Sequence, residues 1–220
     1  MAPSAPYQPA LLRLLHAGIA LFGLTALITG YWVYDQFDHR LGKIGLPTLD
    51  DIQGIHGTLG LAFLLWLPGF TLYSLRLGHR RLLQPQSLQQ LQHWTQPQAT
   101  IALHRLANTL LLLSGTAAVI TGRMMKEGWL PAGDLQQPWY IAHLVTWLLL
   151  LLSIAVHVLL GAKVGGAPLL LSMFRLSIHD NDRPPTWLQK FPPQPVNSLL
   201  LGLEILTLGG IGLSFILPLF

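Results

Sequence analysis

The stretch PWYIAHLVTWLLLLLSIAVHVLLG, residues 138–161, is almost wholly apolar and yet contains two histidines, His143 and His157. About 20 apolar residues in a helix cross the hydrocarbon core of a bilayer, so this stretch is long enough to span a membrane. An ionisable side chain in such a segment is costly, and its default interpretation is a functional one with a specific partner. Both histidines are therefore expected to bind something inside a membrane.

The two histidines lie on nearly the same face of the predicted helix. They are fourteen residues apart, which at about 100° per residue is roughly 40° short of four full turns. The same separation corresponds to about 21 Å along the helix axis. One helix face thus carries a nitrogen ligand near each surface of the membrane.

The composition of the whole chain agrees with a membrane protein. Of its 220 residues 51% are hydrophobic and only 10% are charged, whereas soluble domains carry about 25% charged residues. The chain has no cysteine, which excludes disulfides, iron–sulfur ligation and covalent haem attachment. Its pI is near 9.7, but the basic residues lie in short loops between apolar runs. This pattern indicates membrane topology rather than a nucleic-acid partner.

The sequence predicts an all-α integral membrane protein with a four-helix bundle and a fifth, C-terminal transmembrane helix. Five apolar stretches are long enough to span a bilayer: Ala10–Tyr34, Ile52–Leu75, Thr100–Gly122, Pro138–Gly161 and Asn197–Leu217. The predicted division is a core at 1–162, a loop at 163–196 and the fifth helix at 197–220. Within the loop, APLLLSMFRL is a candidate interfacial helix, and HDNDRPPTWLQKFPPQP is expected to be irregular because of its proline pairs. No small-residue cleavage site follows the first apolar run, so the N-terminus is expected to be retained.

The cations between the spans predict the orientation. Nine fall on one side, namely Arg13, Arg76, Arg80, Arg81, Arg105, Lys163, Arg175, Arg183 and Lys190. Four fall on the other, namely Arg40, Lys43, Arg123 and Lys126. Cytoplasmic loops carry the excess of Lys and Arg, so the N-terminus is expected in the cytoplasm and the C-terminus outside.

Two other spans place histidines at the depths of His143 and His157. His16 lies near the start of the first span, at the cytoplasmic level of His157, and His56 lies near the start of the second span, at the level of His143. Two imidazoles that face each other across a helical bundle are what a low-spin b-type haem requires. The four histidines therefore predict two bis-histidine haem b groups and transmembrane electron transfer, and filled axial positions argue against oxygen chemistry.

Neighbouring residues fit this hypothesis. Gly18, Gly57 and Gly60 would let helix backbone approach a bulky flat group. Haem propionates need cations or polar donors, and the candidates are Arg13, Arg105 or Lys163 for the cytoplasmic-side haem and Lys43, Arg123 or Lys126 for the other.

Three alternatives stay open for the membrane histidines. They could be hydrogen-bonded within the bundle, they could bind zinc, or they could relay protons in a transporter. Tetrahedral zinc requires ligands clustered at one place, and a proton relay usually includes buried acids, of which only Glu204 is available. The remaining loop histidines, His39, His79, His93 and His179, are interpreted as solvated.

A fifth histidine, His104, lies one turn into the third span, on the cytoplasmic side. With Arg105 and Asn108 it forms a polar cluster at the membrane edge. One interpretation is contact with a haem propionate or with backbone. The other is a quinone site in which His104 or Asn108 holds a quinone carbonyl.

At these residues the chain resembles the prokaryotic di-haem cytochrome b561 superfamily, which includes bacterial cytochrome b561 and the cytochrome b subunits of formate dehydrogenase and nickel–iron hydrogenase. The matching segments are RLLHAGIALFGLTALITG in the first span, IHGTLGL in the second, ITGRMM at the end of the third and AHLVTWLLLLLSIAVHVLLG in the fourth. The SMF after the fourth span and Trp187 also resemble the tail of the formate dehydrogenase type.

The resemblance implies that His16 and His157 bind a cytoplasmic-side haem, that His56 and His143 bind the other, and that quinone binds near the start of the third span. It also implies an iron–sulfur or dehydrogenase subunit as electron donor. Two departures are the fifth helix and the absence of an N-A-G-Q-K stretch in the third span.

The predicted function is transmembrane electron exchange with the quinone pool, as a subunit or partner of a larger oxidoreductase in a bacterial inner membrane or a thylakoid. The alternatives are a stand-alone reductase of a small soluble acceptor and a haem-free transporter or scaffold. Membrane lipid is the expected surrounding in each case.

Overall fold

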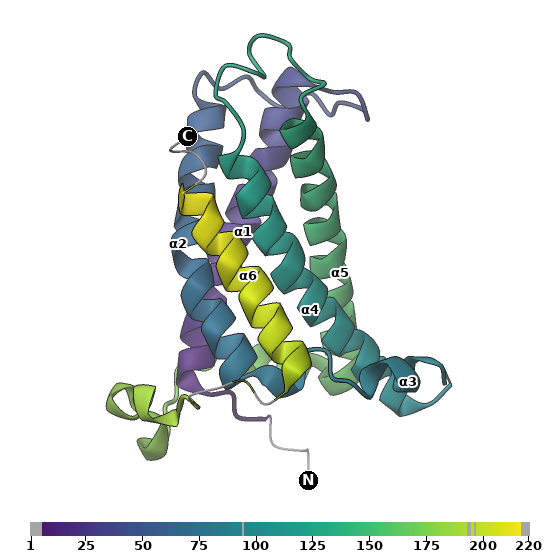
Figure 1. The fold of residues 1–220 in the computed structure, drawn as a ribbon, viewed down its shortest axis with the longest axis vertical. Coiled ribbons are helices and arrows are strands. Elements are labelled where there is room, and N and C mark those ends of the chain that lie inside the picture. Colours follow the sequence, from purple (N-terminus) through teal and green to yellow (C-terminus); the bar gives the residue numbers. More distant parts are fainter. Residues whose placement is uncertain (1–5, 94, 193–194, 196, 217–220) are drawn as a thin grey trace.

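Five long helices dominate the computed structural model of the chain, which describes residues 6–93, 95–192, 195 and 197–216. They are α1 (Ala10–Phe37), α2 (Ile52–Arg76), α4 (Pro97–Arg123), α5 (Pro138–Ser172) and α6 (Ser198–Ile216) (Figure 1). Each is long and apolar enough to cross a membrane. The predicted all-α, multi-span fold is thus confirmed, and four of the five predicted spans agree with the helices to within about one turn, although Leu217, at the end of the fifth, lies outside the described residues.

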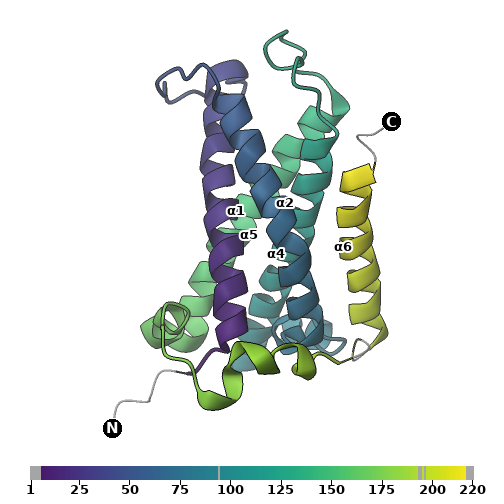
Figure 2. The same cartoon turned by 90° about the vertical axis from the view of Figure 1, so that its left-hand side faces the viewer.

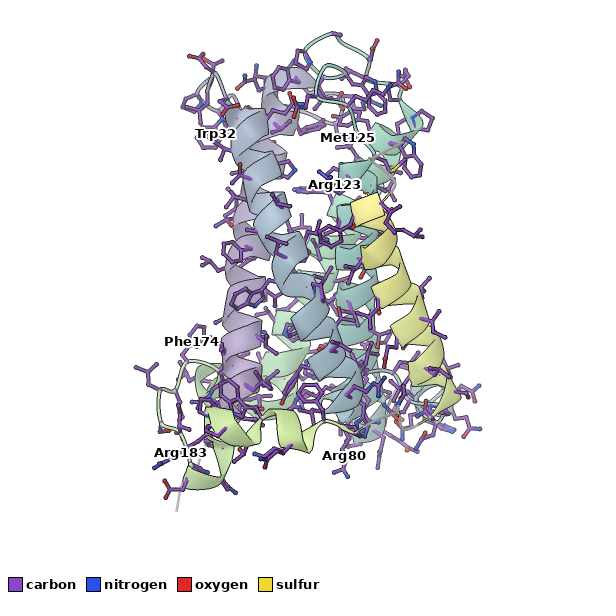
Figure 3. The ribbon with its side chains drawn as sticks, turned by 60° about the vertical axis from the view of Figure 1, so that its left-hand side comes forward. Trp32, Arg80, Arg123, Met125, Phe174 and Arg183 are labelled. Atoms are coloured by element: carbon purple, nitrogen blue, oxygen red, sulfur yellow. The ribbon has the colours of Figure 1, made fainter. Side chains whose placement is uncertain are left out.

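The short elements all lie near one end of the bundle. They are η1 (His79–Arg81), α3 (Ser87–Leu91), η2 (Asp180–Asp182), η3 (Pro184–Thr186) and η4 (Leu188–Lys190). We call the end at which α1 begins the lower end and the opposite end the upper end, as drawn in Figure 1. Arg80 and Arg183 lie at the lower end, and Trp32 and Met125 at the upper end (Figure 3).

Helix α5 extends further than predicted. It continues past Gly161 to Ser172 and is interrupted only at Gly166, which has φ 61° and ψ −167°. A residue with a Cβ rarely adopts this backbone conformation, and Pro168 follows two residues later, so the kink falls where the sequence permits it. Up to this kink the helix runs only about one turn past the predicted end at Gly161, and the residues beyond it form a second helical segment.

The expected interfacial helix, APLLLSMFRL, is confirmed in part: a separate helical segment follows the kink at Gly166 and runs to Ser172, and the stretch is no longer helical from Met173 onward. The predicted irregular stretch after it contains three single 3₁₀ turns, η2 to η4, and its residues 193 and 194 lie outside the described part of the chain. Proline pairs prevent longer helices and strands there, but they are compatible with short turns.

The five helices form two tightly packed pairs and one covering helix. Helix α1 packs along α2, and α4 packs along α5, whereas α1 and α5 approach each other at few residues. Helix α6 lies across α2 and α4 on the side away from α1 (Figures 1 and 2). The main apolar core lies between α2, α4 and α6. The space between the two pairs is thus left for side chains from all four helices.

Two features fix α6 in this position. Arg76 donates two hydrogen bonds to Glu204, at 2.7 and 2.5 Å, and a third to the carbonyl of Pro192 at 3.1 Å. Near the upper end, a Cβ on Gly210 would lie 2.9 Å from Ile120 and 3.2 Å from Thr116. Small residues allow such close helix approach in membranes.

The chain that follows α5 runs beneath the bundle and binds the start of α1 (Figure 2). Asp182 accepts hydrogen bonds from the backbone N–H of Ala10 at 2.6 Å and from the hydroxyl of Tyr7 at 2.7 Å. The buried Arg13 donates to the carbonyls of Arg175 and Ser177. Since no side chain next to α1 caps its first turn, the distant Asp182 supplies the cap.

Candidate functional site

Four of the membrane histidines meet in two pairs at different levels of the bundle. The ring centres of His16 and His157 are 6.3 Å apart, and those of His56 and His143 are 6.0 Å apart. We call these the lower pair and the upper pair. In each pair one ring comes from α5 and the other from α1 or α2, so both pairs bridge the space between the two helix pairs.

These separations suit a metal held between two imidazoles. A ring nitrogen lies about 2 Å from the metal that it binds, and the ring centre lies about 1 Å further back, so two such rings on opposite sides have centres about 6 Å apart. Among the described residues no group of three or more His, Cys, Asp or Glu could hold a metal ion. The arrangement therefore fits two-coordinate axial ligation better than a clustered zinc site.

A cavity of about 620 Å³ surrounds the upper pair and opens between the two helix pairs. This volume is within the range of small-molecule and cofactor sites. Gly57 and Gly60 line the cavity, and a Cβ on either would meet no atom within 4 Å. Arg123 and Lys126 line the cavity as well, as expected of residues that were predicted to bind the propionate groups of a haem.

Hydrogen bonds orient three of the four rings through their Nδ1 atoms. Nδ1 of His56 lies 3.3 Å from the hydroxyl of Thr29, and Nδ1 of His143 lies 3.0 Å from the hydroxyl of Thr121. Neither threonine is among the site residues predicted from the sequence. The signal that could have identified them is a hydroxyl residue on a facing helix at the depth of a histidine.

In the lower pair, the side chain of Asn108 fixes His157. Its Nδ2 donates to the carbonyl of Arg81 at 2.8 Å, and its Oδ1 lies 2.6 Å from Nδ1 of His157. A carbonyl can only accept, so the amide NH₂ faces Arg81 and the amide oxygen receives the proton of Nδ1. His157 therefore presents an unprotonated Nε2, the form that binds a metal.

His104 is a third imidazole at the lower level. Its ring centre lies 5.4 Å from that of His157, and its Nε2 is buried without a hydrogen-bond partner among the described residues. The two rings come from α4 and α5, which pack directly against each other, and their centres are closer than the roughly 6 Å expected of two rings on opposite sides of a metal. His16, which faces His157 from α1, has the separation of an axial partner.

Other predicted site residues are engaged elsewhere. Arg13 binds the chain after α5, as described above, and Arg105 donates to the carbonyl of Arg80 at 3.1 Å. A Cβ on Gly18 would lie 2.0 Å from the indole of Trp66, so the flat group that Gly18 accommodates is this indole. Lys43 and Lys163 are exposed. Contacts of these residues with a cofactor stay predictions.

A comparison with protein families gives a match over most of the chain. The family model described as prokaryotic cytochrome b561 matches residues 7–176, a range that contains both histidine pairs and ends before α6. Comparisons with curated proteins and with solved structures give no match.

Proposed function

Because the chain belongs to the prokaryotic cytochrome b561 family, whose membership implies electron transfer by haem b in a membrane, we propose which residues carry this function. His16 and His157 hold one haem b, and His56 and His143 hold the second. The observation that carries the assignment is the pair of ring separations, 6.3 and 6.0 Å, at two levels of one bundle.

The chain's own residues have three tasks in this function. The four imidazoles supply the iron ligands, Asn108 and the two threonines orient three of the rings, and the apolar helices exclude water. Haem b supplies a one-electron couple between ferric and ferrous iron. Two histidines for each haem would leave no ligand position for a substrate, so the proposed electron transfer would need no substrate pocket at the iron.

Quinone exchange at the lower level is part of the proposal. His104 is the better candidate for the quinone carbonyl, because its buried Nε2 has no partner among the described residues. Asn108 can reach a quinone only by giving up one of its two hydrogen bonds. An iron–sulfur or dehydrogenase subunit is the proposed electron donor.

Haem quantification with single histidine replacements tests the assignment. The purified chain is expected to contain two haems, and His16→Ala and His56→Ala one each. The exposed His93 in a loop offers a matched control, and His93→Ala should retain both. A wild-type chain with fewer than two haems, or an unchanged haem content in His16→Ala, contradicts the proposal.

Quinol oxidation tests the role of His104 separately. His104→Leu should retain both haems but lose most of the reduction of the lower haem by a quinol analogue, while reduction by dithionite stays complete. Unchanged quinol reduction in this variant would remove His104 from the quinone site. Faster reduction by soluble donors than by quinols in the wild type would favour a stand-alone reductase instead.

A further inference from the structure

The tripeptide Ile-Thr-Gly occurs twice at the upper level, at residues 28–30 of α1 and at residues 120–122 of α4. In each copy the threonine hydroxyl contacts one ring of the upper pair. Thr29 lies 3.3 Å from Nδ1 of His56, and Thr121 lies 3.0 Å from Nδ1 of His143. Thr29 on α1 thus contacts a ring near the start of α2, and Thr121 on α4 contacts a ring near the start of α5.

The glycine of each copy makes room for the same ring. A Cβ on Gly30 would lie 3.1 Å from Cε1 of His56, and a Cβ on Gly122 would lie 3.1 Å from Cε1 of His143. Both contacts are tighter than a side chain normally makes. Each Ile-Thr-Gly segment therefore bonds an imidazole on its Nδ1 and leaves space beside its Cε1.

The hydroxyl protons determine which tautomer the rings adopt. Thr29 donates to the carbonyl of Thr25 at 2.8 Å, and Thr121 donates to the carbonyl of Ala117 at 2.8 Å. A hydroxyl has a single proton, so with that proton in the helix its oxygen can only accept from the ring. Both rings then carry their proton on Nδ1 and have a free lone pair on Nε2.

We propose that the two Ile-Thr-Gly segments are positioning sites that set the tautomer of the upper pair and the reduction potential of the haem between its rings. This inference rests on the proposed haem assignment. A ring that donates from Nδ1 becomes a more basic ligand at Nε2. A more basic ligand favours ferric over ferrous iron, so each threonine hydroxyl lowers the potential of this haem.

The lower pair offers an internal comparison, because its acceptor is of another kind. His157 donates to the amide oxygen of Asn108 at 2.6 Å, and this contact lies on a different part of α4. Changes at the two threonines should therefore act on one haem only.

Redox titration of the full-length chain tests the inference. Thr29→Val and Thr121→Val should each raise the midpoint potential of one haem, the double variant should raise it further, and the other haem should be unchanged. Asn108→Leu should raise the potential of the other haem instead. A His16→Ala background, which retains only the upper haem, assigns the signals.

Matched controls separate this role from a general effect on the helices. Thr25 and Thr116 donate to backbone carbonyls of α1 and α4 but contact neither ring, and Thr25→Val and Thr116→Val should leave both potentials unchanged. Thr121→Ser retains a hydroxyl and should keep the wild-type value. Equal potentials in Thr121→Val and wild type, or an equal shift in Thr25→Val, would overturn the inference.

The outcomes also distinguish this inference from the proposed function. A wild-type chain without two haems contradicts the function, whereas a two-haem chain with unshifted threonine variants contradicts only the role of the Ile-Thr-Gly segments. If Thr121→Val loses the upper haem, retention of that haem in Thr121→Ser supports the inference and its loss there overturns it.

Discussion

Gly60 combines two properties, a place in the lining of the upper cavity and free space for a side chain. A Cβ on Gly60 meets no protein atom within 4 Å, although Gly60 lines the 620 Å³ cavity beside His56. A larger side chain there is therefore compatible with the helices and competes only with a cofactor.

Gly60→Leu is expected to remove one of the two haems and to leave the other in place. The measurement is haem content per chain together with the redox titration, which identifies the haem that is lost. Gly202 on α6 provides the control, since a Cβ there also meets no atom within 4 Å but lies outside the cavity. Two haems in Gly60→Leu would mean that the cavity is not the haem site.

The sequence predicted the histidines of the candidate haem sites but not the residues that contact them. The two histidine pairs followed from helix periodicity and span direction, because both are properties of one chain segment at a time. The partners of their Nδ1 atoms depend on how neighbouring helices rotate about their axes, which no local pattern encodes. For the same reason the close contact between Gly18 and the indole of Trp66 did not follow from the sequence.

At the scale of helices, α6 depends on an ion pair within its apolar surface. Glu204 accepts two hydrogen bonds from Arg76, and both side chains are mostly shielded, with 16% and 11% of the side-chain surface exposed for Arg76 and Glu204. Removing one partner of a shielded pair leaves the other charge without compensation, whereas replacing both by apolar residues is often neutral.

Glu204→Ala should lower the Tm of the detergent-solubilised chain clearly, while the double variant Arg76→Met, Glu204→Leu should recover most of the loss. Thermal unfolding followed by the loss of soluble monomer measures both. A double variant as unstable as Glu204→Ala would show that the contact with the Pro192 carbonyl, rather than the ion pair, holds α6.

The cap of α1 predicts a pH dependence at the lower end. Burial alone would raise the pKa of Asp182, but hydrogen bonds from Ala10 and Tyr7 and the nearby Lys190 lower it below the ordinary value of 3.8. A carboxyl group with a lowered pKa stabilises the fold above its ordinary pKa, and this contribution is lost as the pH falls through the lowered value.

Hydrogen exchange of the first turn of α1 should therefore be slow above about pH 4 and become faster below it, after correction for the intrinsic rate. Asp182→Ala should show the faster exchange at every pH, with a loss of about 1 kcal/mol as is usual for an N-cap. Asp180, whose partner Arg183 is exposed like itself, offers the control. Equal pH profiles for Asp182→Ala and the wild type would contradict this role.

The helices themselves were predictable because span length and proline positions are local. Pro97 and Pro138 each stand in the first turn of a helix, where the missing N–H costs nothing. The end of α5 was not predictable from hydropathy alone, since the helix continues beyond the apolar run to the kink at Gly166.

At the scale of the whole molecule, the cation distribution predicts a cytoplasmic N-terminus. Nine cations fall on the predicted cytoplasmic side and four on the other. A reporter that is active only outside the cytoplasm should be active when fused after residue 220 and inactive when fused after Gln92. The reverse pattern would invert the assignment of both haem levels.

The family match ends before α6, which predicts that the four-helix core binds both haems alone. A chain shortened to residues 1–196, with Arg76→Met to avoid an unpaired charge, should retain two haems and have a lower Tm. The control is Arg76→Met, Glu204→Leu in the full-length chain. Loss of a haem in the shortened chain would make α6 part of the cofactor site and redefine the predicted core at 1–162.

The capping of the first helix by Asp182 has a consequence for biosynthesis. The two bonded residues are 172 positions apart, so at about 5–20 residues per second the ribosome needs roughly 10–30 s to supply the cap after Ala10 has been made. During this interval four helices enter the membrane while the first turn of the earliest one is left open to water. Maturation of the N-terminal segment is thereby postponed until almost the entire polypeptide has been translated.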